Sequence, residues 1–545
     1  MKEMRKALAL ALAVIMATAA FAGCGQTETK VSEESSSVQA SVAESTSQEP
    51  EVAEPEPKDP ITLEWYYAGN GMQQDTQKVE DYVNELLKDF EGLEHVTLHL
   101  NCFTNDVYKD QVALAQTAGK QMDIIQTYKL DYNQEVANGT FIALDDYLAM
   151  DEYADLYNEL PEWLWNQVVR DGSTYVVPIY QIGATSCYVF LPEEYAQYGD
   201  LDVFRSFDIH DVSTVTAYCE EIEKITLAVR EAEGTTTKYC AGIAGSISTY
   251  GDFVHRDIFD QKSGFMLLHG DETVTNIYLT DAWKEACRFA AKWVEEGLLP
   301  ADLGVRNTST WSTKYMLDPE SYILTIGNGY GSEELQSEKK TLEYGFDTVA
   351  VNMYEDYFFR ASWGAGGNGI TTTCENPEDA LTLLQALNTA AGAEIYNALV
   401  YGLEGVHYEK VDDTHIKTLE YDSSQGGTST TYAGWKWILG NTSYVYLNQG
   451  CTEGEAELVK EINENPDNLA SILLGGFNLV LDPVSTEIAQ CRTVVEEYSS
   501  TLTQGAKGAD WEAYYDEFVA KLEAAGVQKV MDYIQGELDA FLSTK

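Results

Sequence analysis

The chain has 545 residues and a formal net charge of −55, from 89 acidic and 34 basic side chains. Such an acidic surface repels phosphate backbones, so nucleic acid is excluded as an expected partner, and an anionic ligand is disfavoured unless a local pocket overrides the global charge. The length exceeds that of one ordinary domain, so we expect at least two lobes.

Residues 1–23 have the pattern of an export leader. A basic start is followed by an apolar run, Ala7 to Ala20, and small residues precede Cys24. The run is short for a bilayer span, which needs about 20 apolar residues. The leader resembles a bacterial lipoprotein signal, which implies cleavage before Cys24, acylation of its thiol, and tethering to the extracellular face of the cell membrane. An uncleaved anchor, or a secretory leader cut elsewhere, is the alternative.

Residues 24–59 form a linker in this interpretation. After Cys24 the segment is almost all Ser, Glu, Gln, Thr, Val, Ala and Pro and contains no aromatic residue. It has too little apolar surface to offset the entropy lost on ordering. We therefore expect a flexible stalk that holds a folded body clear of the lipid.

Strands and helices alternate from residue 60 onward. The predicted order is strand, helix, strand, helix, strand, over Ile61–Tyr67, Val79–Phe90, Val96–Leu100, Tyr108–Ala118 and Asp123–Gln126. This alternation indicates a mainly parallel sheet covered by helices, and such sheets bind ligands beyond the carboxyl ends of their strands.

Later segments continue the mixed pattern. We predict helices over Val215–Glu231 and Asp281–Glu296, a strand over Tyr322–Ile326 that ends in a glycine turn, and a helix that starts after Asn376. The C-terminal region is expected to be chiefly helical, with its best segments at Val494–Leu502, Trp511–Ala525 and Val530–Leu542.

The cysteines give no metal motif. The eight besides Cys24 are spread singly, without a Cys-x-x-Cys pair, which argues against a zinc knuckle. A large exported body does not need disulfides, so we expect mostly free, buried thiols, with pairing left open. We predict neither a cofactor nor a metal site.

The chain contains, in this order, the segments ITLEWYYAGNGMQQD, DIIQTYKLDYNQEVANGTFIALDDYL, TYVVPIYQI and YILTIGNGY. Together these resemble the family 1 extracellular solute-binding proteins, the sugar-capturing components of ABC importers. It also contains IYNALVYGLEGVHYEKVDDTHI, WKWILGNTSYVYL and GGFNLVLDPVSTEIAQCRTVVEEY. These strings are similar to the lipoprotein LplA-like subgroup, which has a distinctive C-terminal region.

The resemblance implies a type II periplasmic-binding-protein-like α/β fold, in which two lobes are joined by crossover strands and enclose a ligand cleft. It places the crossovers near Tyr175–Ile182, Ser362–Ile370 and Tyr432. Lobe I is then residues 60–180 plus 370–432, and lobe II is residues 181–369 plus 433–545 with the helical C-terminal region.

Sugar sites pair flat aromatic surfaces with hydrogen-bonding side chains. Tyr67, Asn70 and Gln73 lie at the end of the first strand and in the turn after it, and Tyr128 follows the third strand. The carboxyl ends of parallel strands are where a ligand is expected, so these side chains are candidate ligand contacts. For Tyr67, ordinary core packing is an equal alternative.

Further candidates follow later strands. Tyr330 stands after a glycine turn, where the resemblance implies a sugar platform, and replacing it with Ala is expected to weaken binding. Trp435 and Trp437 are two residues apart and would share one face of a strand. Trp363, beside a glycine run, has the alternative of a lobe-interface anchor, and Phe477 has the alternative of core packing.

These observations predict a tethered monomer that captures a carbohydrate, an oligosaccharide in particular, and delivers it to an ABC importer permease without chemical change. A lipid-anchored glycoside hydrolase is the enzymatic alternative, since such enzymes use paired carboxylates and these are abundant here. Searches for His-Glu-x-x-His, Gly-x-Ser-x-Gly and phosphate-loop motifs find nothing. A peptide-binding lipoprotein is the third possibility.

Overall fold

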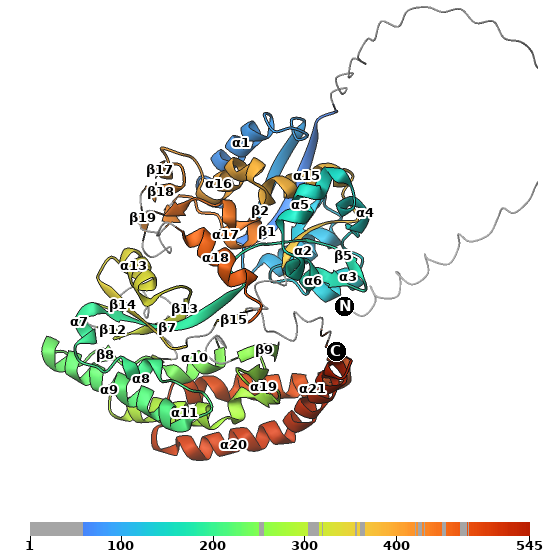
Figure 1. Ribbon diagram of the computed structural model, residues 1–545. Coiled ribbons are helices and arrows are strands. Elements are labelled where there is room, and N and C mark those ends of the chain that lie inside the picture. The colour runs from blue at the N-terminus through green and yellow to red at the C-terminus, as the bar shows by residue number, and fades with distance from the viewer. Residues whose placement is uncertain are drawn as a thin grey trace, which may run out of the picture. The chain divides into compact units, whose positions relative to one another are not determined.

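A computed structural model describes residues 58–249, 255–303, 316–318, 320–354, 357–359, 366–419, 421–422, 428–429, 431–448, 454–468, 477 and 479–544 (Figure 1). The leader, Cys24, the linker as far as residue 57, Trp363 and Cys451 lie outside the described residues. The described part holds two large hydrophobic cores, each built around its own sheet, and we call the surrounding elements the first and second lobes.

The first lobe is built on a five-stranded sheet. Its strands, in spatial order, are β2 (Val96–Thr104), β1 (Ile61–Gly69), β3 (Ile124–Gln126), β16 (Gly367–Ile370) and β6 (Val177–Pro178). β1 runs parallel to both β2 and β3, while β16 is antiparallel to its neighbours. Helices α1 (Thr76–Leu87) and α2 (Tyr108–Thr117) link the first three strands. The predicted alternation of strands and helices is confirmed.

Helix α1 shows why the sequence folds this way. Val79, Val83 and Leu87 recur at four-residue spacing and are fully buried, so they form one apolar face of the helix. That side of the lobe packs α1 against β2 and against α16 (Ala393–Tyr401). Figure 1 shows α1 and α16 beside β1 and β2.

The second lobe is organised around β7 (Ala184–Pro192). β13 (Thr325–Gly329) and β14 (Thr348–Asn352) pair antiparallel with it on either side, and β15 (Phe358–Phe359) pairs with its first residues. The predicted single strand over 322–326 is wrong, because β12 (Ser321–Tyr322) pairs with β8 (Lys238–Tyr239) in a separate sheet. Ile323 and Leu324, both fully buried, lie between the two strands.

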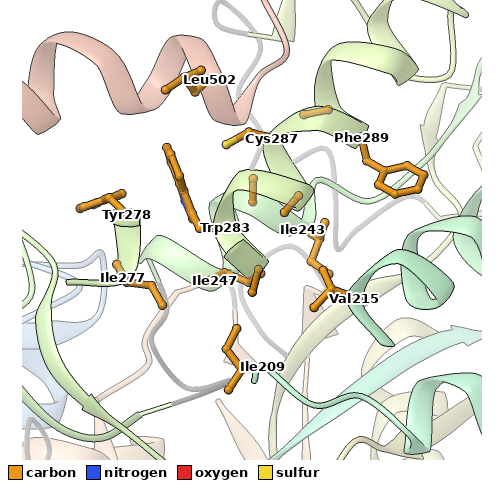
Figure 2. Close-up of a cluster of buried hydrophobic side chains, with 14 of the residues drawn as sticks. Ile209, Val215, Ile243, Ile247, Ile277, Tyr278, Trp283, Cys287, Phe289 and Leu502 are labelled. Carbon is orange, nitrogen blue, oxygen red and sulfur yellow. The ribbon is translucent and has the colours of Figure 1, made fainter. Parts of the chain in front are cut away.

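Helices that contribute to the second core complete this lobe. They are α9 (Val212–Glu233), α10 (Ile243–Thr249), α11 (Asp281–Glu295), α19 (Ser485–Thr503), α20 (Trp511–Ala524) and α21 (Val527–Leu542), which confirms the predicted helical C-terminal region. Thr280 caps α11, since its hydroxyl accepts a hydrogen bond from the Trp283 backbone N–H at 3.2 Å. Figure 2 shows Trp283 among Tyr278, Leu502 and the other buried side chains of this core.

Smaller elements join these parts. The shorter helices are α3 (Tyr132–Ala137), α4 (Asp145–Leu148), α5 (Ala154–Glu159), α6 (Glu162–Val168), α7 (Glu193–Ala196), α8 (Asp202–Arg205), α13 (Glu333–Tyr344), α15 (Pro377–Asn388), α17 (Lys436–Leu439) and α18 (Glu455–Glu464). The remaining strands are β4 (Val169–Arg170), β5 (Ser173–Thr174), β9 (His255–Asp260), β10 (Phe265–Leu268), β11 (Val274–Asn276), β17 (Tyr408–Lys410), β18 (His415–Thr418), β19 (Tyr421–Asp422), β20 (Thr428–Ser429) and β21 (Leu447–Asn448).

The chain passes between the lobes at several points. Residues 179–183 connect β6 of the first sheet to β7 of the second, within the predicted first crossover. The predicted second crossover, Ser362–Ile370, is described from residue 366 onward, where the chain enters β16 of the first sheet. The third was predicted near Tyr432, yet Ile438, Leu439 and Val445 pack in the first core. Their apolar side chains keep the chain with the first lobe as far as β21, and the next passage includes α18.

The cysteines in the described residues include five buried thiols, Cys102, Cys219, Cys240, Cys287 and Cys491, and the half-buried Cys374. These six are unpaired, as the sequence predicts. None of the helices that the structure describes is both long and apolar enough to cross a membrane.

Candidate ligand-binding site

A cavity of about 890 Å³ opens at the carboxyl end of β3. This is the edge at which a parallel sheet is expected to bind its ligand, and the volume is within the usual range for ligand pockets. Its wall comes from the end of β3 and the loop to α3, from Arg170, from the crossover, from α17, and from Lys262 of the second lobe. The cavity is therefore lined by side chains of both lobes.

The loop after β3 has an unusual backbone. Lys129 has a φ of 72°, in the left-handed region that residues with side chains rarely adopt. Its ammonium group lies 4.4 Å from the centre of the Tyr128 ring, a cation–π contact. Strained backbone of this kind gathers at functional sites, and both residues line the cavity.

Three predicted aromatic residues meet at this cavity: Tyr128, Trp435 and Trp437. The ring centres of Tyr128 and Trp435 are 6.3 Å apart, and Trp437 is 40% exposed. The prediction of a strand for the two tryptophans is wrong, since Trp435 is the N-cap of helix α17 and Trp437 lies in its first turn. Burial of Ile438 and Leu439 in the first core decides that local structure.

Asn70 and Gln73 are not among the residues that line the cavity, but they hold the segment that carries Trp435. The carbonyl of Ala433 accepts from the side-chain amides of Asn70 at 3.0 Å and Gln73 at 2.9 Å. The Ala433 N–H donates to the Gln73 Oε1 at 3.0 Å, and the indole N–H of Trp435 donates to the Asn70 Oδ1 at 2.9 Å. Asn70 and Gln73 therefore support Trp435 and its neighbour Ala433 and do not themselves line the cavity.

Tyr67 and Phe477 are packed in the two cores. Tyr67 is 4% exposed, its ring centre is 5.0 Å from that of Trp65, and burial raises its pKa well above the usual range. Phe477 is buried, with the ring centre of Phe541 at 5.4 Å. Neither lines the cavity, which matches the core packing that the sequence left open for both.

Tyr330 lies in a cluster around α18. Its hydroxyl hydrogen-bonds to the carboxylate of Glu455. The Lys339 ammonium group donates to that hydroxyl at 2.9 Å, pairs with Glu455, and lies 4.4 Å from the ring centre. Tyr330 also packs against the small apolar group that contains Ile182 and Ile462. It is not a lining residue of the cavity.

Arg170 is a cavity residue that sequence reasoning missed. Its Nε donates to the Asn133 Oδ1 at 2.5 Å, and one terminal nitrogen donates to the carbonyls of Gln167 at 2.8 Å and Val169 at 2.7 Å. The guanidinium lies 4.8 Å from the centre of the Tyr132 ring. Burial lowers the pKa of Arg170, although an arginine remains charged at neutral pH.

Other lining residues that the sequence analysis missed are Gln126, Gln181, Lys109, Lys129 and Lys262. Gln126 could have been found, because it ends a predicted strand at the carboxyl edge of the sheet. The lysines carry no local signal. Among the described residues, no three or more His, Cys, Asp or Glu side chains are grouped to hold a metal ion.

Known proteins that are similar to this chain support its fold. The chain is 24% identical over 457 residues, which is 80% of its length and 83% of the relative's, to a carbohydrate ABC transporter substrate-binding protein of Streptococcus pneumoniae serotype 4. Residues 473–543 of the chain match a domain family of unknown function, DUF3502.

Solved structures of solute binding proteins have a similar fold. The N-glycan transport solute binding protein NgtS of Streptococcus pneumoniae has a TM-score of 0.66 at 19% identity, covering 89% of this chain and 99% of that one. An HMO-binding, ABC-transporter-associated solute binding protein of Bifidobacterium longum infantis has a TM-score of 0.54 at 14% identity, covering 89% of this chain and 99% of that one. The fold is that of the type II periplasmic solute-binding proteins.

Proposed function

We propose that the protein is an extracellular solute-binding protein that captures a carbohydrate, an oligosaccharide in particular, and delivers it to an ABC importer permease. The observation that carries this proposal is the aromatic wall of Tyr128, Trp435 and Trp437 beside a cavity of about 890 Å³. Aromatic faces stack on the C–H faces of sugar rings, while amide side chains such as Gln126 and Gln181 suit sugar hydroxyls.

Capture proceeds by hinge closure about the crossover. Most of the cavity wall belongs to the first lobe, whereas Lys262 comes from the second. Contacts that a ligand makes with both lobes are complete only when the lobes are closed, so the ligand shifts the population toward the closed form. The permease would recognise that closed form.

Binding without hydrolysis is favoured by the cavity's carboxylates. Asp131 is the single carboxylate among the described lining residues, and its side chain accepts a hydrogen bond from the Gln134 N–H at 3.1 Å, which caps α3. A glycoside hydrolase needs two carboxyl groups across the scissile bond. The described lining of the cavity contains one carboxyl group, that of Asp131.

Calorimetry of the purified protein with a glycan panel tests the function. We expect binding with no new reducing ends over the course of the titration. Release of reducing ends would make it a hydrolase, and binding to peptides alone would make it a peptide-binding protein. Light scattering of the same sample should give the mass of a monomer.

Membrane attachment is a separate part of the proposal. It is supported by the basic and apolar leader and by Cys24, because two acyl chains on one cysteine hold a protein durably on a membrane. Cys24→Ser should release the protein from membranes of the producing cells, whereas Cys374→Ser should leave it attached. Attachment of the Cys24→Ser protein would contradict acylation at this residue.

A further inference from the structure

Basic side chains gather in the cavity, against the charge of the chain as a whole. Lys109, Lys129, Arg170 and Lys262 line it, and Asp131 is the only carboxylate among the described lining residues. The whole chain has 89 acidic and 34 basic side chains. A wall that followed this composition would carry more carboxylates than cations, so the local excess of positive charge needs its own explanation.

These four cations are not neutralised within the described part of the chain. None of them makes an ion pair there, whereas cations elsewhere do, such as Lys292 with Glu223 at 2.6 Å. Arg170 donates to neutral oxygens, those of the Asn133 side chain and of the Gln167 and Val169 carbonyls. The positive charge of these four side chains is therefore available to a ligand.

Gln126 supplies an independent sign of a missing acceptor. Its side chain is buried, and its Oε1 accepts from the Tyr128 N–H at 2.9 Å, which fixes the orientation of the amide. The amide nitrogen, Nε2, is buried without a hydrogen-bond partner among the described residues. It would lie 3.9 Å from a Cβ added to Gly366, another lining residue. Leaving a buried donor unpaired is unfavourable, so an acceptor from a ligand is favoured here.

We infer that the cavity takes an acidic carbohydrate, one that bears a carboxylate or a sulfate, with its ring on the aromatic wall and its anionic group balanced by the four cations. This rests on the proposed carbohydrate function and narrows its substrate class. A neutral sugar would leave the cavity with four cations against the single carboxylate of Asp131. An anionic oxygen also gives Gln126 the acceptor that it lacks, and guanidinium groups bind carboxylates and sulfates well.

Matched ligand pairs test the inference on the purified full chain. We would titrate trigalacturonic acid against its carboxyl-reduced counterpart, sialyllactose against lactose, and lactose sulfate against lactose. The first two acids present carboxylates and the third a sulfate, so the pairs separate the two chemistries. At least one acid should bind about tenfold more tightly than its neutral counterpart, and this preference should shrink as sodium chloride rises from about 0.05 M to about 0.5 M.

Exposed lysines allow a variant that keeps the fold. Lys109→Gln combined with Lys129→Gln should lower the ratio of the affinity for the acidic ligand to that for its neutral counterpart by about tenfold. Lys120→Gln is the control, because Lys120 is exposed, belongs to the same lobe and does not line the cavity. Its affinity for the acid should equal that of the wild type.

Three outcomes would overturn the inference. If neutral sugars bind and their acidic partners bind no better, the acidic class is wrong although the carbohydrate function stands. If no sugar binds, both the acidic class of ligand and the proposed carbohydrate function are wrong. If acidic peptides bind in preference to acidic sugars, the cations serve a peptide carboxylate and not a glycan.

Discussion

Two regions of the molecule contain lysine, carboxylate and amide side chains, but only one of them pairs these groups with one another. The α18 cluster, which we define as Gly183, Tyr330, Lys339, Glu455 and Asn463, finds its partners inside the protein: Lys339 pairs with Glu455, and the Asn463 amide bonds to the crossover backbone. The cavity wall has four cations against the single carboxylate of Asp131, and an amide nitrogen without an acceptor among the described residues. Because buried polar groups are normally satisfied, the first pattern indicates structure and the second indicates a ligand.

Asn463→Ala should have the largest effect, and on stability. The Asn463 Oδ1 accepts from the Gly183 N–H at 2.7 Å, and its Nδ2 donates to the Gln181 carbonyl at 2.9 Å, while the side chain is 1% exposed. Removing the amide leaves two buried backbone groups unpaired, so the free energy of unfolding should fall by about 3 kcal/mol. Chemical denaturation measures this.

Lys460→Ala is the control for the same helix, because its side chain is largely exposed and its ion pair with Glu464 is long, at 3.7 Å. It should change the free energy of unfolding by less than about 0.5 kcal/mol. A similar small change for Asn463→Ala would mean that α18 does not brace the crossover.

Trp435→Ala should have the next largest effect, and on affinity. Trp435 is a half-buried wall residue that packs against the first core without belonging to its buried set, so its loss removes aromatic surface from the cavity while the buried side chains of that core are kept. Truncations of such central aromatic residues typically cost about 2 kcal/mol of binding, or roughly thirtyfold. Titration with a bound glycan measures the loss, and the melting temperature should stay close to that of the wild type.

Tyr157→Ala is the matched control, since Tyr157 is an exposed aromatic residue of the same lobe that does not line the cavity. Equal losses of affinity in the two variants would show that the effect is not specific to the wall.

Local periodicity explains what the sequence could predict. Val79, Val83 and Leu87 give the helical period without reference to any partner, and α1 was found for that reason. The spacing of Trp435 and Trp437 has the period of a strand, yet tertiary burial of the next residues, Ile438 and Leu439, makes this segment a helix. Propensity was overridden there by packing.

The candidate site was predictable in part, for a similar reason. Tyr128 was placed at the cavity from its position after a strand, because the fold class fixes where strand ends meet. Lys109, Arg170 and Lys262 come from separate parts of the chain. In a sequence with an excess of acid, no spacing marks three distant cations as neighbours, and only the tertiary structure brings them together.

Tyr330 can be assigned to one region or the other by two substitutions. Its hydroxyl bonds to Glu455 and Lys339, and the Lys339 ammonium group lies 4.4 Å from the ring centre. We therefore expect Tyr330→Phe and Tyr330→Ala each to lower the free energy of unfolding by about 1–2 kcal/mol, with affinity for glycan kept within about threefold of the wild type.

The sugar-platform prediction from the sequence gives the opposite pattern. Under it, Tyr330→Phe keeps the stacking ring and binds normally, while Tyr330→Ala loses about 1 kcal/mol of binding or more. Calorimetry on both variants separates the two roles, since the Phe variant removes only the hydroxyl.

Asn70→Ala should have the smallest effect, because it acts through Trp435. The Asn70 Oδ1 accepts from the indole N–H of Trp435, while Gln73 still holds the Ala433 carbonyl when Asn70 is removed. Asn70→Ala removes two hydrogen bonds, to the Ala433 carbonyl and from the Trp435 indole, but only the second is left without a substitute. Loss of that bond costs about 1 kcal/mol, or roughly fivefold in affinity. In a protein that already carries Trp435→Ala, Asn70→Ala should cause no further loss, because the side chain it orients is absent. An equal loss in both backgrounds would mean that Asn70 contributes to binding by a route that does not involve Trp435.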